Sequence, residues 1–206
     1  MFDKKSNDTL LACIRQGKAL TRNEMLSLIV GLSIPSILAQ VTNVLMFYID
    51  AAMVGKLGAA ASASIGLVES ATWLFGGLCS AVSLGFSVQV ARFIGANDFV
   101  KARQVLRHAL VCTLAFSLLV TLCASLIAFK LPIWLRGGDD IAHDAALYFL
   151  IYALSVPFLQ LGILSSNMLK SAGNIQIPSI MSVLMCVLDV VFNYLFIYVA
   201  GLGVPG

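Results

Sequence analysis

Three carboxylate side chains lie inside long apolar stretches of the sequence, where acidic residues are least expected. They are Asp50, Glu69 and Asp189, and the other acids of the chain lie in polar segments outside these stretches. If the stretches cross a lipid bilayer, a charged group near its centre costs about 2.5–3.5 kcal/mol on insertion scales. A residue held at such a cost has either a packing role or a functional one, so these three acids are the first candidates for chemistry.

Asp50 ends a polar stripe on its predicted helix. At about 100° per residue, Ser36, Gln40, Asn43, Phe47 and Asp50 fall within about 80° of one another. Lipid disfavours a polar face, so we expect this one to look into a helix bundle or a water-filled cavity. An alternative is that Asp50 lies near enough to the outer surface to stay hydrated.

A proline lies inside the same predicted helix. Pro35 removes one backbone donor and can kink the helix, which would give it two possible shapes. A simple structural bend is the alternative reading of the same residue.

The last apolar stretch carries a second polar pair. Asn193 follows Asp189 by one helical turn, so both side chains share one face. Glu69, in contrast, lies near the middle of its stretch without a clear polar stripe around it. For Glu69 we leave two roles open, a hydrogen bond to a neighbouring helix and a part in transport.

Carboxyl groups in apolar surroundings can couple the movement of ions. Desolvation favours the neutral, protonated form, and a cation can take the place of the proton. Such a site has two mutually exclusive occupants, H⁺ or a cation such as Na⁺. If the helices meet, Asp50, Asn43, Asp189 and Asn193 could supply oxygen ligands for Na⁺.

The sequence has no arrangement that would indicate an enzyme. It lacks the GxxxxGK[ST] loop that cradles the phosphates of ATP. His108 and His143 lie far apart in the sequence and flank apolar stretches, and the five cysteines form no CxxC pair. We therefore predict no catalytic residues, no cofactor and no dedicated metal centre, with the sodium site above as the one exception.

The elements that must position these residues are membrane-spanning helices. The chain has 206 residues, of which 60% are hydrophobic and 11% are charged, against about a quarter charged in soluble domains. A span needs about 20 apolar residues, and five runs qualify, at residues 25–54, 59–91, 109–129, 145–169 and 177–200. None shows strand-type alternation, so the sequence predicts an all-α, polytopic helical bundle over residues 25–206.

The basic residues predict the orientation of the bundle. With residues 1–24 as a cytoplasmic segment, ten Lys and Arg lie inside and three outside, which favours a cytoplasmic N-terminus. The three outside are Lys56, Lys130 and Arg136. The net charge of +3 is too small to indicate a nucleic-acid partner. We expect a capping box from Thr21 and Glu24 just before the first span.

Small residues recur every four positions in the second apolar run. They are Ser62, Gly66 and Ser70, followed by Gly77, Ala81 and Gly85. Small residues at this spacing let helices approach closely, so we expect this face to pack against another helix.

Several motifs resemble those of the multidrug and toxic compound extrusion (MATE) transporters. The run IPSILAQVTNVLMFYIDAAMVGKLG is similar to that family's first helix, where a proline is followed by D-x-x-x-V-G-x-L-G. ARFIGANDFVKAR, NMLKSAGNIQIP and LFIYVAGLGVPG extend the resemblance, which covers nearly the whole chain from about residue 26.

The resemblance implies a twelve-helix fold of two six-helix lobes, of which this chain resembles part of the amino-terminal one. It implies export of cationic or amphipathic drugs and toxic compounds in exchange for H⁺ or Na⁺ across a plasma or bacterial inner membrane. Asp50 matches the family's coupling aspartate, Pro35 its first-helix proline, and Asn167, loosely, a fourth-helix asparagine. The family often has Asn then Asp on its fifth helix, whereas here Asp189 precedes Asn193.

The length departs from the family, because about five of twelve helices are present. We therefore expect an incomplete lobe whose partners are small cationic or amphipathic substrates, the bilayer and a missing carboxyl-terminal lobe. Two alternatives remain. One is a lipid-linked oligosaccharide flippase of the related superfamily, which would need a cationic cavity for its phosphate. The other is a membrane fragment that transports nothing.

Overall fold

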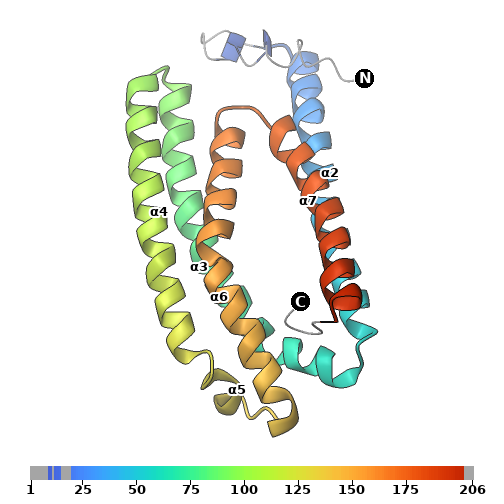
Figure 1. Cartoon of the computed structure of the whole chain (residues 1–206). Helices are drawn as coiled ribbons and strands as arrows, with labels where there is room; N and C mark the ends of the chain where they lie inside the picture. The colour runs from blue at the N-terminus through green and yellow to red at the C-terminus, as the bar shows by residue number, and fades with distance from the viewer. Residues whose placement is uncertain (1–8, 11, 15–19, 202–206) are drawn as a thin grey trace.

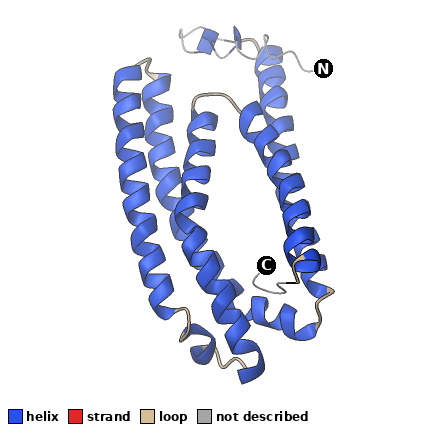
Figure 2. Cartoon of the chain, viewed as in Figure 1, coloured by secondary structure: helices blue, strands red, loops and turns tan. Residues whose placement is uncertain are grey.

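The computed structural model describes residues 9–10, 12–14 and 20–201. Most of the predicted cytoplasmic segment at residues 1–24 therefore lies outside the described residues, as do residues 202–206 of the last family-like motif. Within the described part of the chain, all regular structure is helical (Figure 2). The prediction of an all-α fold is confirmed.

Five long helices form the molecule (Figure 1). They are α2 (Arg22–Gly55), α3 (Ala59–Gly95), α4 (Phe99–Ile127), α6 (Asp139–Ser171) and α7 (Gln176–Asn193). A single short helix, α5 (Leu131–Trp134), lies between α4 and α6, and α7 continues as the π-helix η1 (Tyr194–Val199). Each of the five is long and apolar enough to cross a membrane, so the polytopic architecture is confirmed.

Local capping chemistry sets where two of the helices begin. The Thr21 backbone N–H donates to Glu24 Oε2 at 2.8 Å, and the Glu24 N–H donates to Thr21 Oγ1 at 3.4 Å, so the capping box is present. Asp98 accepts from the Lys101 N–H at 3.0 Å and caps α4. Because of this cap, α4 begins ten residues before the apolar run predicted to start at residue 109.

The helices pack in two groups. α3, α4 and α6 pack against one another, and α2 packs mainly against α7. Figure 1 shows α2 and α7 side by side, with the other three long helices together. α2 and α7 run in the same direction, and the α2–α3 and α6–α7 turns lie at opposite ends of the bundle.

Small, aliphatic and aromatic residues hold the three-helix group together. Its buried clusters include Val68, Phe149 and Ala153 at one level and Ala109 and Leu164 at another. Side-chain hydrogen bonds to backbone carbonyls add to this packing, from Tyr152 to Thr72 at 2.9 Å, from Thr121 to Ala153 at 2.9 Å and from Ser171 to Ser87 at 3.0 Å. These contacts join α3, α4 and α6 along most of their length.

The packing role predicted for the small residues of α3 is wrong for this chain. All six of these small residues are exposed, namely Ser62, Gly66, Ser70, Gly77, Ala81 and Gly85. A Cβ added at Gly66, Gly77 or Gly85 would meet nothing within 4 Å. The residues of α3 that pack against α4 and α6, such as Ser64 and Ser83, lie on another face of the helix. The prediction failed because spacing alone cannot say which of two faces lined by small residues meets a neighbour.

Candidate functional site

Asn193 joins the two acids of α2 and α7. Its Nδ2 donates to Asp50 Oδ1 at 2.8 Å and to Asp189 Oδ2 at 3.3 Å. Asp189 and Asn193 lie one turn apart on α7, so both present their side chains on one face toward the end of α2. All three side chains are half-buried. We call Asp50, Asp189 and Asn193 the acid–amide cluster.

The two carboxyl groups of the cluster share one hydrogen-bond donor group and have no positively charged partner within the cluster. One amide group supplies donors to both carboxyl groups, which lie close enough to interact directly with each other. Two like charges at short range disfavour double ionisation, and a proton or a cation between them relieves the repulsion. The arrangement therefore has the chemistry that a site for one proton or one monovalent cation needs.

Tyr148 of α6 extends this polar region to the three-helix group. It lies close enough to both Asp50 and Glu69 for their charges to act on its phenol group, and it is partly buried. No sequence pattern singled out Tyr148. Its signal was a polar hydroxyl within an apolar run, but which helix face it occupies depends on how α6 packs. Glu69 is half-buried on α3.

Other predicted site residues lie away from the cluster. Gln40 and Asn43 are exposed on α2, and Asn43 lies seven residues before Asp50, about 10 Å along the helix. The structure thus brings together three of the four predicted sodium ligands and leaves Asn43 apart. Within the described residues, no group of three or more His, Cys, Asp or Glu side chains could hold a metal ion.

Asn167 also lies far from the cluster. It is half-buried in α6, nineteen residues beyond Tyr148, which is about 28 Å along the helix. It lies near the end of α6 that leads into α7, whereas Asp50 lies at the opposite end of the bundle (Figure 1). Pro35 lies inside a continuous α2, and its carbonyl oxygen accepts a hydrogen bond from Ser179 Oγ at 2.9 Å.

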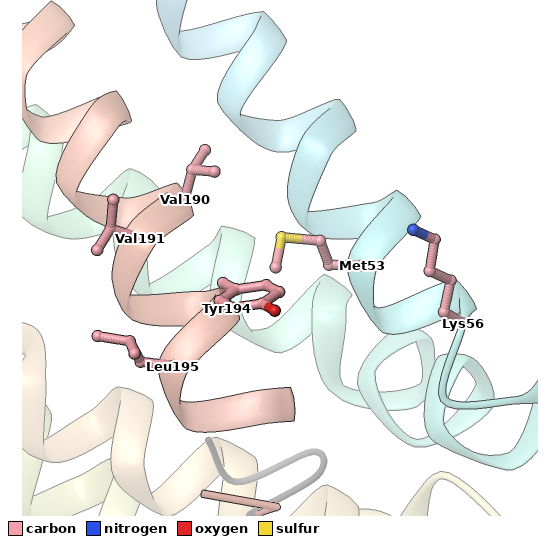
Figure 3. A pocket seen from close by; sticks show the side chains of 6 residues that line it. All are labelled: Met53, Lys56, Val190, Val191, Tyr194 and Leu195. Carbon is pink, nitrogen blue, oxygen red and sulfur yellow. The ribbon is translucent and has the colours of Figure 1, made fainter. Parts of the chain in front are cut away.

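A pocket of about 600 Å³ lies beside the cluster, between the end of α2 and the α7–η1 segment. Figure 3 shows its lining, Met53 of α2 and Lys56 just after the end of that helix, with Val190, Val191, Tyr194 and Leu195 from the α7 side. Its walls are mainly apolar, and Lys56 brings the one charged group of the lining. None of the three cluster residues lines it, so this pocket and the cluster are distinct features.

Comparisons with known proteins agree on one family. The MatE family profile matches residues 35–195. A curated relative described as an FAD transporter, from Shewanella oneidensis, is 25% identical over 180 residues, which cover 85% of this chain and 38% of the relative.

Solved structures show the same fold. A multidrug resistance MATE family transporter of the MOP superfamily, in an outward-facing conformation, has a TM-score of 0.85 at 23% identity and covers 98% of this chain. A MOP superfamily transporter from Pyrococcus furiosus, whose description notes the reverse polarity of its binding pocket, has a TM-score of 0.82 at 24% identity and covers 87% of this chain.

The chain spans about 40% of the length of these relatives, since the match covers 42% and 40% of the two solved chains. The match falls on roughly the amino-terminal lobe of the fold, as the sequence predicted. Because the family profile covers most of its length, this chain belongs to the MatE family of multi-pass membrane transporters.

Proposed function

We propose that this chain forms the ion-coupling lobe of an exporter that exchanges H⁺ or Na⁺ for cationic or amphipathic compounds. The observation that supports the proposal most directly is the acid–amide cluster, in which Asn193 of α7 donates to Asp50 of α2 and to Asp189. Acids on two packed helices are tied through one amide, so a change in their charge acts on both helices at once.

Occupancy of the cluster is the coupling step in this proposal. When one positive charge binds, the carboxyl groups no longer repel each other, and α2 and α7 stay close. When it leaves, repulsion between Asp50 and Asp189 favours a different arrangement of the pair. Glu69 on α3 and Tyr148 on α6 extend the polar region to the second group of helices. Ion binding or release at the cluster therefore also affects that group.

The acids favour positively charged substrates. Asp50, Glu69 and Asp189 lie within the long helices, whereas the Lys and Arg residues of α2, α3 and α6 lie at or near the helix ends. A cavity bordered by these helices would carry negative potential, which attracts cations and repels phosphate groups. The same argument disfavours a flippase of phosphate-linked oligosaccharides.

The orientation follows from the basic ends of the helices. Arg92, Lys101 and Lys170 lie at the same end of the bundle as the start of α2 (Figure 1). By the positive-inside rule we place this end, and the N-terminus, in the cytoplasm of a cell bounded by a plasma or inner membrane. Alternating access requires two lobes, so we propose that the chain acts with a second, carboxyl-terminal lobe.

A second candidate function comes from the curated relative. That protein is described as an FAD transporter, and flavin dinucleotides are anionic. Lys56 in the pocket beside the cluster is a cation of the kind that an anionic substrate needs. Anionic dinucleotides such as FAD are therefore the alternative substrate class for the same fold.

Transport into lipid vesicles tests both candidates. The chain is purified together with a carboxyl-terminal lobe and reconstituted, and the vesicles are loaded with a fluorescent organic cation or with FAD, under a pH gradient, a sodium gradient or neither. We expect gradient-driven movement of the cation, loss of this movement in Asp50→Asn, and retention in Asp98→Asn, which makes the same chemical change on the α3–α4 turn. Normal export by Asp50→Asn, or movement of FAD alone, contradicts the cation-coupled mechanism. Vesicles in which the wild-type protein moves neither compound would favour a chain without transport activity.

A further inference from the structure

A second polar contact joins α2 to α7, far from the acid–amide cluster. Ser179, in the first turn of α7, is buried with 9% of its surface exposed. Its Oγ lies 2.9 Å from the carbonyl oxygen of Pro35 and 2.8 Å from that of Ile175. A hydroxyl group has one proton to donate, so these two carbonyl groups compete for it.

The acceptor on α2 lies in a turn that lacks one backbone hydrogen bond. Pro35 has no N–H, so the carbonyl group of Gly31 loses its usual donor one turn earlier, and a helix can bend at such a point. Gly31 and Ala39 are buried on either side of Pro35 on the same face of α2. α7 therefore packs directly against the turn that proline weakens.

The two contacts match in register along the helix pair. Fifteen residues separate Pro35 from Asp50 on α2, and fourteen separate Ser179 from Asn193 on α7. At about 1.5 Å per residue these lengths are about 22 and 21 Å. Because the helices run in the same direction with nearly equal lengths between the contacts, the pair is tied at both levels. α2 cannot change shape at Pro35 on its own while both ties hold.

We propose that Ser179 is a positioning residue, whose hydroxyl ties the proline turn of α2 to α7. Through this tie, ion occupancy of the acid–amide cluster affects the half of α2 that contains Pro35. When the Ser179 hydroxyl donates to the Pro35 carbonyl oxygen, the two helices move as one unit. When it donates instead to the Ile175 carbonyl oxygen of its own helix, the proline turn is released. The second part of this inference rests on the proposed function, because it needs an ion at the cluster, whereas the tie itself does not.

Hydrogen exchange of the whole chain in lipid nanodiscs, followed by mass spectrometry, tests the tie. We expect Ser179→Ala to speed exchange of the α2 amides after Pro35, at residues 36–40, by about 2- to 10-fold, which corresponds to loss of one hydrogen bond. Ser179→Thr keeps a hydroxyl and should restore the wild-type rate. The control is Ser182→Ala, because among the described residues the Ser182 hydroxyl donates only to the Pro178 carbonyl oxygen of its own helix, at 3.0 Å.

A double-mutant cycle guards against a general loss of structure. Pro35→Ala restores the missing backbone donor, so in that background Ser179→Ala should have little further effect on residues 36–40. Exchange in α3, α4 and α6 should stay unchanged throughout. Equal effects of Ser179→Ala and Ser182→Ala would overturn the tie, and a full effect of Ser179→Ala in the Pro35→Ala background would overturn its dependence on the proline turn.

The same measurement with and without Na⁺, and at acid and neutral pH, tests the transmission. In the wild type and in Ser179→Thr, the ion should slow exchange at residues 46–55 and also at residues 36–40. In Ser179→Ala the change should be confined to residues 46–55. An effect that still reaches residues 36–40 in Ser179→Ala overturns the transmission. If no ion alters exchange at residues 46–55 in the wild type, the ion site fails, and the tie is judged by the first experiment alone.

Discussion

Asn193 and Asp50 are 143 positions apart in the chain, yet the amide of one donates to the carboxylate of the other at 2.8 Å. Because Asn193 also donates to Asp189 at 3.3 Å, a single side chain gathers the acids of the first and last long helices. Helices α2 and α7 are thereby linked at the level where the proposed function places a coupling ion. The consequences of this link, and of contacts elsewhere in the bundle, can be measured.

Replacing Asn193 should weaken the helix pair. Asn193→Ala removes the donor to two carboxyl groups, and a hydrogen bond to a charged group contributes about 1.5–3 kcal/mol. We expect the free energy of unfolding in mixed micelles to fall by that amount. The control is Asn43→Ala, an exposed asparagine of α2, which should change it by less than about 0.5 kcal/mol. Equal losses from the two substitutions would show that the bond to Asp50 adds no stability.

A buried glutamine in the three-helix group should not tolerate a carboxylate. Gln160 Nε2 donates to the Cys79 carbonyl oxygen at 2.9 Å and to Ser83 Oγ at 3.0 Å. Among the described residues, its Oε1 has no hydrogen-bond partner. Gln160→Glu removes both donors and buries a further acid, so we expect a loss of at least about 2 kcal/mol in unfolding free energy.

The comparison for Gln160 is Gln104→Glu, the same change at an exposed position of α4. Its unfolding free energy should stay within about 0.5 kcal/mol of the wild type. If Gln160→Glu unfolds no more easily than Gln104→Glu, the bonds from Gln160 do not hold α6 against α3.

Two adjacent glycines of α3 should respond differently to alanine. A Cβ at Gly76 would lie 3.1 Å from Tyr152 Oη, whereas at Gly77 it would meet nothing within 4 Å. Gly77→Ala should stabilise the helix by about 0.5–1 kcal/mol through lower backbone entropy. Gly76→Ala should lose that gain, because it pushes Tyr152 away from its 2.9 Å bond to the Thr72 carbonyl oxygen.

Removal of the Tyr152 hydroxyl gives the decisive comparison. In a Tyr152→Phe background the obstacle is gone, so Gly76→Ala and Gly77→Ala should have similar effects on thermal unfolding. A difference between the two glycines that persists in this background would mean that something other than the hydroxyl limits the approach of α3 to α6.

The turn between α3 and α4 should show a pH dependence that Asn abolishes. Hydrogen bonds from the Lys101 side chain and backbone hold the pKa of Asp98 below its usual range. A lowered pKa stabilises the folded state above the pKa of the unfolded chain, and this stabilisation disappears as the pH falls through the folded value. The melting temperature of the wild type should therefore exceed that of Asp98→Asn at neutral pH, and the difference should shrink in acid. A difference that is independent of pH would show that the charge of Asp98 plays no part in the cap.

Much of the candidate site could be predicted from residue type and position along the chain. Asp50, Asp189 and Asn193 were recognisable because polar groups within apolar runs are rare, and a spacing of four residues places two of them on one helix face. Gln40 and Asn43 share a stripe with Asp50, but the structure leaves them exposed, because a stripe fixes a direction and does not say where along the helix a neighbour comes close. Asn167 was placed by resemblance alone and lies at the other end of the bundle.

The sequence by itself determined the helices and their membrane character, because hydropathy, length and capping depend on neighbouring residues. It also determined the family, through motifs spread over most of the chain. Only the tertiary structure decided which helix faces meet. Helix rotation and pairing put Ser179 on the Pro35 carbonyl group, brought Tyr148 near Asp50 and Glu69, and left the small-residue stripe of α3 exposed. These outcomes depend on contacts between segments far apart in the chain, which no local pattern specifies.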